Sequence, residues 1–358
     1  MASSIYVGTF PNDPLFTRPE ERSPLGARIY LLDPSACTAP RYVELGLPYL
    51  DAAFLAVNRK TGTLYATNRT GDGGAVSAWS INNDNADLTL REIHETGGAG
   101  PCHLCLDAEG RALFVANYGG SSVTSFLLAP DGGIQHRSDL VAFAGSGPDV
   151  RRQEAAHPHM VLVDPVNGRL LVPDLGSDCV AVYDVDRSTG VLHKLSDKTL
   201  NLPPGSGPRH AVFFPDGDAA VVVNELASTM AMLMRSGDGF RVTDIVRTAT
   251  HDVTNFPSAV RTSPDGSLVY VGNRGDNTVA TFRRHQRTGT LSFLESAPCG
   301  GRPRDVVVDT DAGRLLVANH DNHSVKALAL SEGGLPGAMV PLATIPNPAS
   351  LVVWASPA

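Results

Sequence analysis

Long apolar runs are missing from this sequence, and so is an excess of positive charge. No stretch approaches the roughly 20 apolar residues of a membrane-spanning helix, and the first residues lack the basic and apolar regions of a signal peptide. Lys and Arg number 29 against 37 Asp and Glu, giving a net charge of -8, which excludes the basic surface typical of nucleic-acid-binding proteins. We therefore expect a cytoplasmic protein with no nucleic-acid partner and no membrane.

Cysteine is also scarce. Five cysteines in 358 residues form an odd, scattered set, which argues against a disulfide framework and favours reduced thiols. Cys102 and Cys105 have CxxC spacing, but no second CxxC accompanies them, and residues three apart on a strand point to opposite faces. The sequence therefore predicts neither a metal site nor a bound cofactor.

Glycine and proline are plentiful, with 35 and 26 residues, and such a turn-rich composition favours many short strands over long helices. One pattern returns along the chain: Pro-x, an apolar strand, a turn containing Gly, a second apolar strand, then Asn or Asp. The clear copies run over residues 101–117, 158–174, 208–224, 257–273 and 303–319, and a weaker copy ends at Asn68.

The period of this repeat determines the expected fold. The copies end at positions 68, 117, 174, 224, 273 and 319, which lie 46 to 57 residues apart, close to the ~40–50 residues of a four-stranded propeller blade. Residues 348–354 resemble a further first strand, and residues 5–10 align with 64–69. We predict an all-β, seven-bladed β-propeller, a single domain over residues 1–358, whose last blade is closed by the N- and C-terminal strands.

Superimposing the copies places equivalent residues in rings around the central channel. The first ring, one residue after Pro, holds Cys102, His159, Arg209, Ser258, Arg304 and Ala349, with Ala53 as its weakest member. The second ring, one residue after Asn or Asp, holds Phe10, Arg69, Tyr118, Leu175, Glu225, Arg274 and His320. Because a purely structural position would repeat one residue type, this variety predicts a functional surface.

Both rings contain residues suited to acid–base chemistry and anion binding. His159 is a candidate base and Glu225 a candidate acid or base. Arginine, whose forked guanidinium binds carboxylate or phosphate through two hydrogen bonds, occupies four positions: Arg69, Arg209, Arg274 and Arg304. A loop with Arg152, Gln153 and Glu154 lies in the longest repeat interval, and we expect it to cover the channel mouth.

Other recurring residues have structural explanations. The Asn or Asp that ends each copy readily hydrogen-bonds nearby backbone, and Pro-Asp-Gly at 215–217 and 264–266 is a hairpin-turn signal. We expect no functional role for four other histidines: His103, His210, His251 and His323.

Several ordered motifs resemble a known family. They are Arg152-Gln153-Glu154, His157-Pro158-His159, Gly207-Pro208-Arg209-His210, Val223-Asn224-Glu225 and Gly272-Asn273-Arg274-Gly275, with Tyr6-Val7-Gly8-Thr9 and Asn117-Tyr118-Gly119-Gly120. Together they resemble the seven-bladed lactonase family, which includes propeller-type 6-phosphogluconolactonases and fungal carboxy-muconate lactonising enzymes.

The resemblance implies a metal-independent site at one mouth of the channel. It would be built from His157 or His159 together with Arg209, Glu225 and Arg274. Two positions depart from the family pattern. Arg69 stands where many members carry Glu, and Phe10 stands where Tyr is common.

We therefore expect a lactonase that hydrolyses a sugar-acid lactone. His159 or Glu225 would activate water, and Arg209 or Arg274 would stabilise the carbonyl oxygen as it becomes negative. The residues expected to bind the small anionic lactone or carboxylate are His157, Arg69, Tyr118, Gln153, Arg304 and His320. The alternatives are a muconate-type cycloisomerase using the same groups, and a propeller that serves as an interaction scaffold.

Overall fold

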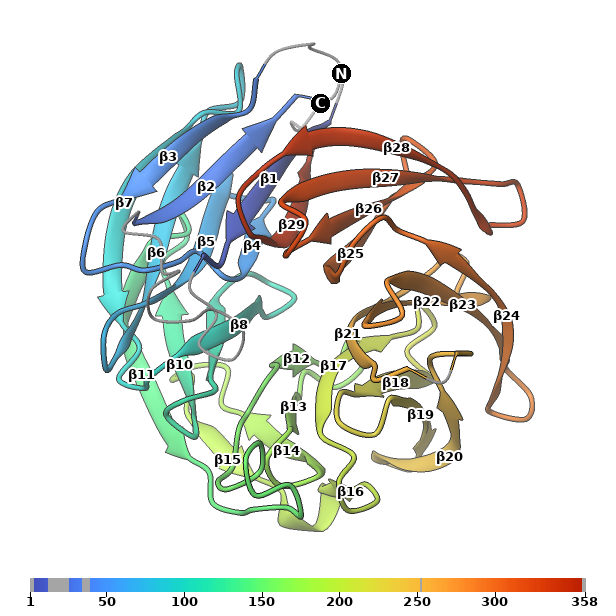
Figure 1. Ribbon diagram of the computed structural model, residues 1–358. Coiled ribbons are helices and arrows are strands. Elements are labelled where there is room, and N and C mark those ends of the chain that lie inside the picture. Colours follow the sequence, from blue (N-terminus) through green and yellow to red (C-terminus); the bar gives the residue numbers. More distant parts are fainter. Residues whose placement is uncertain (1–2, 12–25, 34–38, 252, 356–358) are drawn as a thin grey trace.

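The computed structural model describes residues 3–11, 26–33, 39–251 and 253–355. These residues form seven sheets arranged in a ring (Figure 1). The prediction of an all-β, seven-bladed propeller is confirmed. No helix long and apolar enough to cross a bilayer occurs in the described part of the chain.

Each blade is an antiparallel sheet whose strands follow one another from the innermost outward. Blade 1 contains β29 (Pro348–Trp354), β1 (Ser4–Thr9), β2 (Ala27–Leu32) and β3 (Arg41–Leu45). Blade 2 contains β4 (Leu55–Asn58), β5 (Thr63–Arg69), β6 (Gly74–Ile81) and β7 (Leu88–Glu95). Blade 3 contains β8 (Pro101–Leu106), β9 (Ala112–Asn117), β10 (Ser122–Leu128) and β11 (Ile134–Ala142).

The remaining four blades repeat this order. Blade 4 contains β12 (Leu162–Val163), β13 (Leu170–Asp174), β14 (Cys179–Val185) and β15 (Leu192–Lys194), with β16 (Leu200–Asn201) also paired to β14 and η2 (Ser196–Lys198) between β15 and β16. Blade 5 contains β17 (Pro208–Phe213), β18 (Ala219–Asn224), β19 (Thr229–Ser236) and β20 (Gly239–Arg247). Blade 6 contains β21 (Phe256–Thr262), β22 (Leu268–Arg274), β23 (Thr278–His285) and β24 (Thr290–Pro298). Blade 7 contains β25 (Pro303–Asp309), β26 (Arg314–Asn319), β27 (Ser324–Leu330) and β28 (Pro336–Thr344).

Blade 1 joins the two ends of the chain. The C-terminal strand β29 is its innermost strand and pairs antiparallel with β1, from Ser4 opposite Trp354 to Val7 opposite Leu351. Figure 1 shows β1 and β29 beside each other in this blade. The pairing closes the ring by main-chain hydrogen bonds, as the terminal repeats predicted.

The core lies between the blades. Both faces of a blade are covered, so consecutive residues of a strand enter different apolar clusters. In β1, Tyr6 packs in the cluster shared with blade 2, while Ile5 and Val7 pack in the cluster shared with blade 7. A corresponding cluster lies between the two blades of each of the five remaining neighbouring pairs. Stacking around the ring therefore buries the runs of apolar residues that the repeat contains.

Three of the repeated Asn residues anchor the connection that enters their own blade. The Nδ2 atoms of Asn68, Asn273 and Asn319 donate to carbonyl oxygens in those connections, each at 2.8 Å. These three side chains are fully buried. The structural interpretation of the repeated Asn agrees with these contacts. The Pro-Asp-Gly segments form the expected hairpin turns, with positive φ at Gly217 and Gly266.

Candidate active site

The first ring coincides with irregularities in the innermost strands. In five blades the ladder shifts register next to the residue that follows the repeat's Pro. In blade 5, for example, Pro208 pairs with Asn224 and His210 with Val223, which leaves Arg209 as the extra residue. A β-bulge of this kind leaves one residue outside the ladder and redirects its side chain. The local backbone thus positions the first-ring side chains.

The second ring is held by one repeated main-chain hydrogen bond. In five blades the N–H of the second-ring residue donates to the carbonyl oxygen of the residue before the repeat's Pro. The donors are Phe10, Tyr118, Leu175, Glu225 and His320, and the distances range from 2.7 to 3.0 Å. The two rings therefore lie next to each other.

Glu225 is the centre of the candidate site. Its Oε2 accepts hydrogen bonds from Arg209 Nη1 and Arg274 Nη2, both at 2.6 Å, and its Oε1 accepts one from Arg152 Nη2 at 2.7 Å. The carboxylate is only 2% exposed. Burial alone would raise the pKa of Glu225, but attraction to Arg274, Arg209 and Arg152 outweighs it and holds that pKa well below its usual range. Glu225 is thus an ionised counter-charge and a weak base.

His159 lies against the same cluster. Its Nε2 is 2.5 Å from Arg209 Nη1, and because a guanidinium can only donate, Nε2 accepts this hydrogen bond. Burial, followed by the charge of Arg209, holds the pKa of His159 well below its usual range. The imidazole is therefore neutral at pH 7, with its proton on Nδ1, where Cys102 Sγ lies 3.9 Å away. One guanidinium group donates to His159, whereas three donate to the carboxylate of Glu225.

Tyr118 and His157 form the next part of the rim. Their rings are stacked, with centroids 4.4 Å apart and planes 11° from parallel, and the Tyr118 ring also meets His159 edge-on at 5.3 Å. His157 Nδ1 is 3.0 Å from the carbonyl oxygen of Tyr118, and Nε2 is 3.1 Å from Glu154 Oε1. Both contacts are hydrogen bonds at once only when the ring carries two protons.

The opposite part of the rim is built around Phe10. The guanidinium groups of Arg69 and Arg304 each lie 4.3 Å from the centre of its ring, a cation–π distance. Arg69 also forms an ion pair with the fully buried Asp51. His320 hydrogen-bonds the carbonyl oxygen of Phe10 through Nε2 at 2.9 Å. The two positions that depart from the family pattern, Arg69 and Phe10, are therefore in direct contact.

Arg304 and His320 also line a recess beside Arg274. This recess adjoins an open pocket of about 350 Å³, whose lining includes Arg274, Arg302 and Phe256. Arg274 lines this pocket and also contacts Glu225, so the pocket borders the buried cluster through this one side chain. Two guanidinium groups, of Arg274 and Arg302, and the carboxylate of Asp321 line this pocket.

The long loop before β12 contributes a residue that the ring alignment could not include. Arg152 donates a hydrogen bond to Glu225 in blade 5. The sequence feature that pointed to this loop was its position in the longest interval between repeats. Gln153 is fully buried instead. Its amide bonds the carbonyl oxygen of Leu175 and the carboxylate of Asp178, and its Oε1 accepts from Asp149 N–H. Through these hydrogen bonds Gln153 holds the loop before β12 in position.

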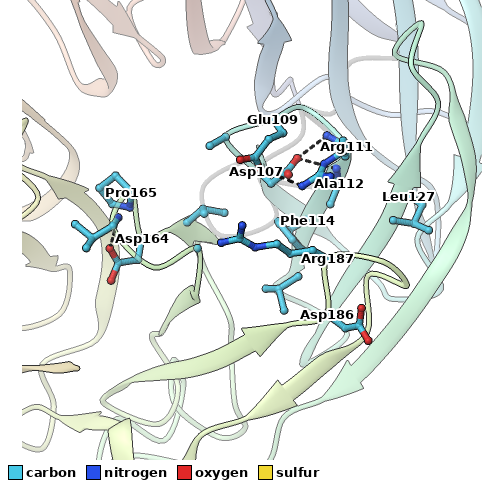
Figure 2. A pocket seen from close by; sticks show the side chains of 15 residues that line it. Asp107, Glu109, Arg111, Ala112, Phe114, Leu127, Asp164, Pro165, Asp186 and Arg187 are labelled. Carbon is cyan, nitrogen blue, oxygen red and sulfur yellow. Dashed lines mark hydrogen bonds and ion pairs between the residues drawn. The ribbon is translucent and has the colours of Figure 1, made fainter.

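A separate pocket lies at the far end of the blades, among the hairpin turns of blades 3 and 4 (Figure 2). Its volume is about 200 Å³. Asp107 Oδ1 accepts hydrogen bonds from the N–H groups of Arg111 and Ala112, and Asp164 Oδ1 accepts from Val166 N–H. Asp164 also forms an ion pair with Arg235 of blade 5, so both carboxylates are bound by protein groups, and the pocket lies away from the rings.

The CxxC cysteines are half-buried thiols. Burial raises the pKa of Cys102 to about 12 and that of Cys105 further, so both are protonated at neutral pH. The four cysteines within the described residues are all free; Cys37 lies outside those residues. In the same part of the chain, no group of three His, Cys, Asp or Glu side chains is arranged to hold a metal ion.

Comparisons with known proteins agree with this fold. A family model described as lactonase, 7-bladed β-propeller, matches residues 43–353. A 6-phosphogluconolactonase of Bacillus subtilis (strain 168) is 31% identical over 283 residues, 78% of this chain and 78% of the relative. The solved structure of a periplasmic gluconolactonase of Pseudomonas aeruginosa has a TM-score of 0.86 at 25% identity and covers 99% of each chain. The chain belongs to the lactonase family of seven-bladed β-propellers.

Proposed function

We propose that this protein hydrolyses a sugar-acid lactone that carries negative charge, such as 6-phosphogluconolactone or a related aldonolactone. The observation that supports this proposal is the charge of the buried cluster, where three guanidinium groups surround the single carboxylate of Glu225. The excess positive charge suits both an anionic substrate and the oxyanion that forms during ester hydrolysis. The name of the Bacillus relative agrees with an anionic lactone, and the name of the Pseudomonas structure agrees with a sugar-acid lactone.

The proposed mechanism assigns water activation to His159. Substrate binding would draw Arg209 from His159 Nε2 toward the lactone carbonyl oxygen, which leaves Nε2 free to accept a proton from water. The resulting hydroxide adds to the carbonyl carbon, and Arg209 and Arg274 stabilise the oxyanion. The ring C–O bond then breaks, and His157, when doubly protonated, can donate a proton to the leaving oxygen. The products are a carboxylate, a hydroxyl group and one net proton.

Glu225 has a positioning role in this mechanism. Because it binds Arg152, Arg209 and Arg274 together, it fixes the donors before substrate arrives. Three guanidinium groups donate to its two oxygens, whereas His159 Nε2 accepts only from Arg209 among the described residues and becomes free when Arg209 moves to the substrate, so between the two candidate bases we propose His159. The other proposed substrate contacts are Arg69, Tyr118, Arg304 and His320 on the rim. We also propose that the protein acts in the cytoplasm.

Hydrolysis in ¹⁸O-labelled water tests the reaction class. A panel of δ-gluconolactone, other aldonolactones and 6-phosphogluconolactone is incubated with the protein, and the product is analysed by mass spectrometry. We expect one labelled oxygen in the product carboxylate and faster turnover of the anionic lactone. A cycloisomerase would yield an unlabelled product, and a binding scaffold would yield none.

Replacement of Arg274 tests the oxyanion contact. We expect Arg274→Ala to lower kcat by about a hundredfold, which is the usual loss for one oxyanion donor, rather than only to raise KM. Arg241→Ala, on the exposed face of the outer strand β20, is the matched control. An Arg274→Ala variant that keeps the wild-type rate at saturating substrate contradicts this role.

A further inference from the structure

A third layer of polar residues lies one step deeper in the channel than the first ring. His103, His210 and Asp305 are the residues that follow the bulges of blades 3, 5 and 7, where the ladders resume opposite Ala116, Val223 and Ala318. They therefore occupy equivalent positions of three innermost strands. The proposed hydrolysis assigns them no role.

Of the two histidines of this layer, His210 lies directly against His159, and His103 lies against His210. The ring centre of His210 is 5.5 Å from that of His159 and 5.4 Å from that of His103. Phe54 covers the other side, with its ring centre 3.9 Å from His103. His103 and His210 are each only 3% exposed. The three imidazoles thus form a continuous buried group that starts at the candidate base.

His210 is not satisfied by protein groups. Neither of its ring nitrogens has a hydrogen-bond partner among the described residues, and His103 Nδ1 has only a 3.5 Å contact from Val161 N–H. A neutral imidazole has one donor and one acceptor, and buried polar groups without partners are rare because desolvation is costly. A buried water molecule meets such needs where several polar groups converge.

The charges around this group oppose a resident proton. Burial, then the charges of Arg261 and Arg209, hold the pKa of His103 well below its usual range, and burial, Arg209, the neighbouring histidines and Arg261 do the same for His210. Arg261 donates to Asp305 Oδ1 at 2.9 Å, and Asp305 is the carboxylate of the layer. The imidazoles are therefore neutral groups that can transfer a proton but do not retain it.

Lactone hydrolysis at neutral pH releases one net proton, because the acid product ionises. If His159 accepts that proton, it lies beside Arg209 and close to the other guanidinium groups, which repel it. The adjacent neutral imidazole of His210 can accept this proton and transfer it away from the arginine cluster.

We propose that His103 and His210 hold an ordered water molecule beneath the candidate active site and relay the released proton from His159 through it. The water site follows from the unpartnered nitrogens alone, whereas the relay rests on the proposed lactone hydrolysis. In the relay, His159 Nδ1–H or Nε2–H gives its proton to the water or to His210, which releases another proton farther along. His159 is thereby returned to its neutral form.

Crystallography tests the water site without any assay of activity. At a resolution that shows ordered water, the wild-type protein should have a water molecule within hydrogen-bonding distance of a His210 ring nitrogen. It should be absent in His210→Phe and retained in His210→Gln, whose amide keeps a donor and an acceptor. A dry contact between His103 and His210 in the wild-type protein overturns the site.

Kinetics tests the relay. We expect His210→Phe and His210→Gln both to lower kcat by about tenfold, a fraction of what full acid–base catalysis contributes, with KM unchanged and a larger solvent deuterium isotope effect on kcat. His136→Phe, on the outer strand β11, is the control. Wild-type kcat in His210→Gln overturns the relay and leaves only a structural water. Inactivity of the wild-type protein on every lactone contradicts the proposed function, while the water density still decides the site.

Discussion

At the scale of single residues, Glu225 connects parts of the chain that are far apart in sequence. Arg152 comes from the loop before blade 4, Arg209 from the innermost strand of blade 5, and Arg274 from blade 6. Each guanidinium is mostly or fully buried, so each depends on this carboxylate for compensation of its charge. Breaking a buried pair by removing one partner is more destabilising than exchanging both.

Replacing Glu225 by Gln isolates this charge effect, because the side chain keeps its shape. We expect Glu225→Gln to lower the free energy of unfolding by about 3 kcal/mol and to reduce turnover, since the three arginines would repel one another. Urea unfolding followed by tryptophan fluorescence measures the first effect. Glu332→Gln, at an exposed turn, is the control. A fully stable Glu225→Gln variant would show that water compensates the guanidinium charges.

At the scale of elements, closure of blade 1 depends on the pairing of β29 with β1. Ser4 lies directly opposite Trp354, and directly opposed residues of antiparallel strands have Cα atoms about 5 Å apart. The last residue of one strand and the first of the other can therefore be joined by a tight turn. With this geometry, the two strands can be joined and the chain ends moved to another turn of the protein.

A circular permutant tests that statement. Trp354 and Ser4 are joined by about four Gly and Ser residues, a length common in hairpins, and new ends are opened between Arg287 and Thr288 in the exposed turn of blade 6. We expect a folded, active protein whose stability is within about 2 kcal/mol of the natural order, because only loop closure changes. A chain that stops at Asn347 should instead aggregate, since β1 is then an open edge. An unfolded permutant would show that the chain ends cannot be moved in this way.

At the scale of the whole molecule, stability is spread over the layers between blades, but it also depends on proton balance. His103, His159 and His210 are buried and have pKa values held well below their usual range. In the unfolded chain these histidines bind protons below about pH 6.5. The unfolded state then binds more protons than the folded state, so stability falls as the pH decreases.

The contribution of one histidine can be measured by difference. Below about pH 6.5, each buried neutral histidine makes the free energy of unfolding fall by up to about 1.4 kcal/mol per pH unit. We expect His210→Phe to have a shallower decline than the wild-type protein between about pH 6.5 and 5, whereas the exposed His136→Phe should keep the wild-type slope. Equal slopes for His210→Phe and wild type would mean that His210 is protonated in the folded state. Chemical denaturation at a series of pH values provides the data.

The fold could be predicted because the repeat is written in the sequence at a regular period, and the same alignment placed Arg209, Glu225 and Arg274 in neighbouring rings. Arg152 could not be placed this way because a loop residue has no equivalent in other blades. The burial of Gln153 depends on its contact with Asp178, a long-range packing detail. Simple strand alternation does not show that a bulge brings His103 and His210, which follow it, into the channel layer. For this reason the sequence alone assigns these two histidines no role.

The bulges of the innermost strands have a consequence for protein engineering. A bulged residue such as Arg209 is left out of the regular ladder, so exchanging its side chain need not disturb the neighbouring strand pairs. Five blades offer such a position at the same depth. A combinatorial library confined to these positions would vary the chemistry of the channel mouth on a constant frame, which makes this propeller a scaffold for hydrolases with new substrate ranges.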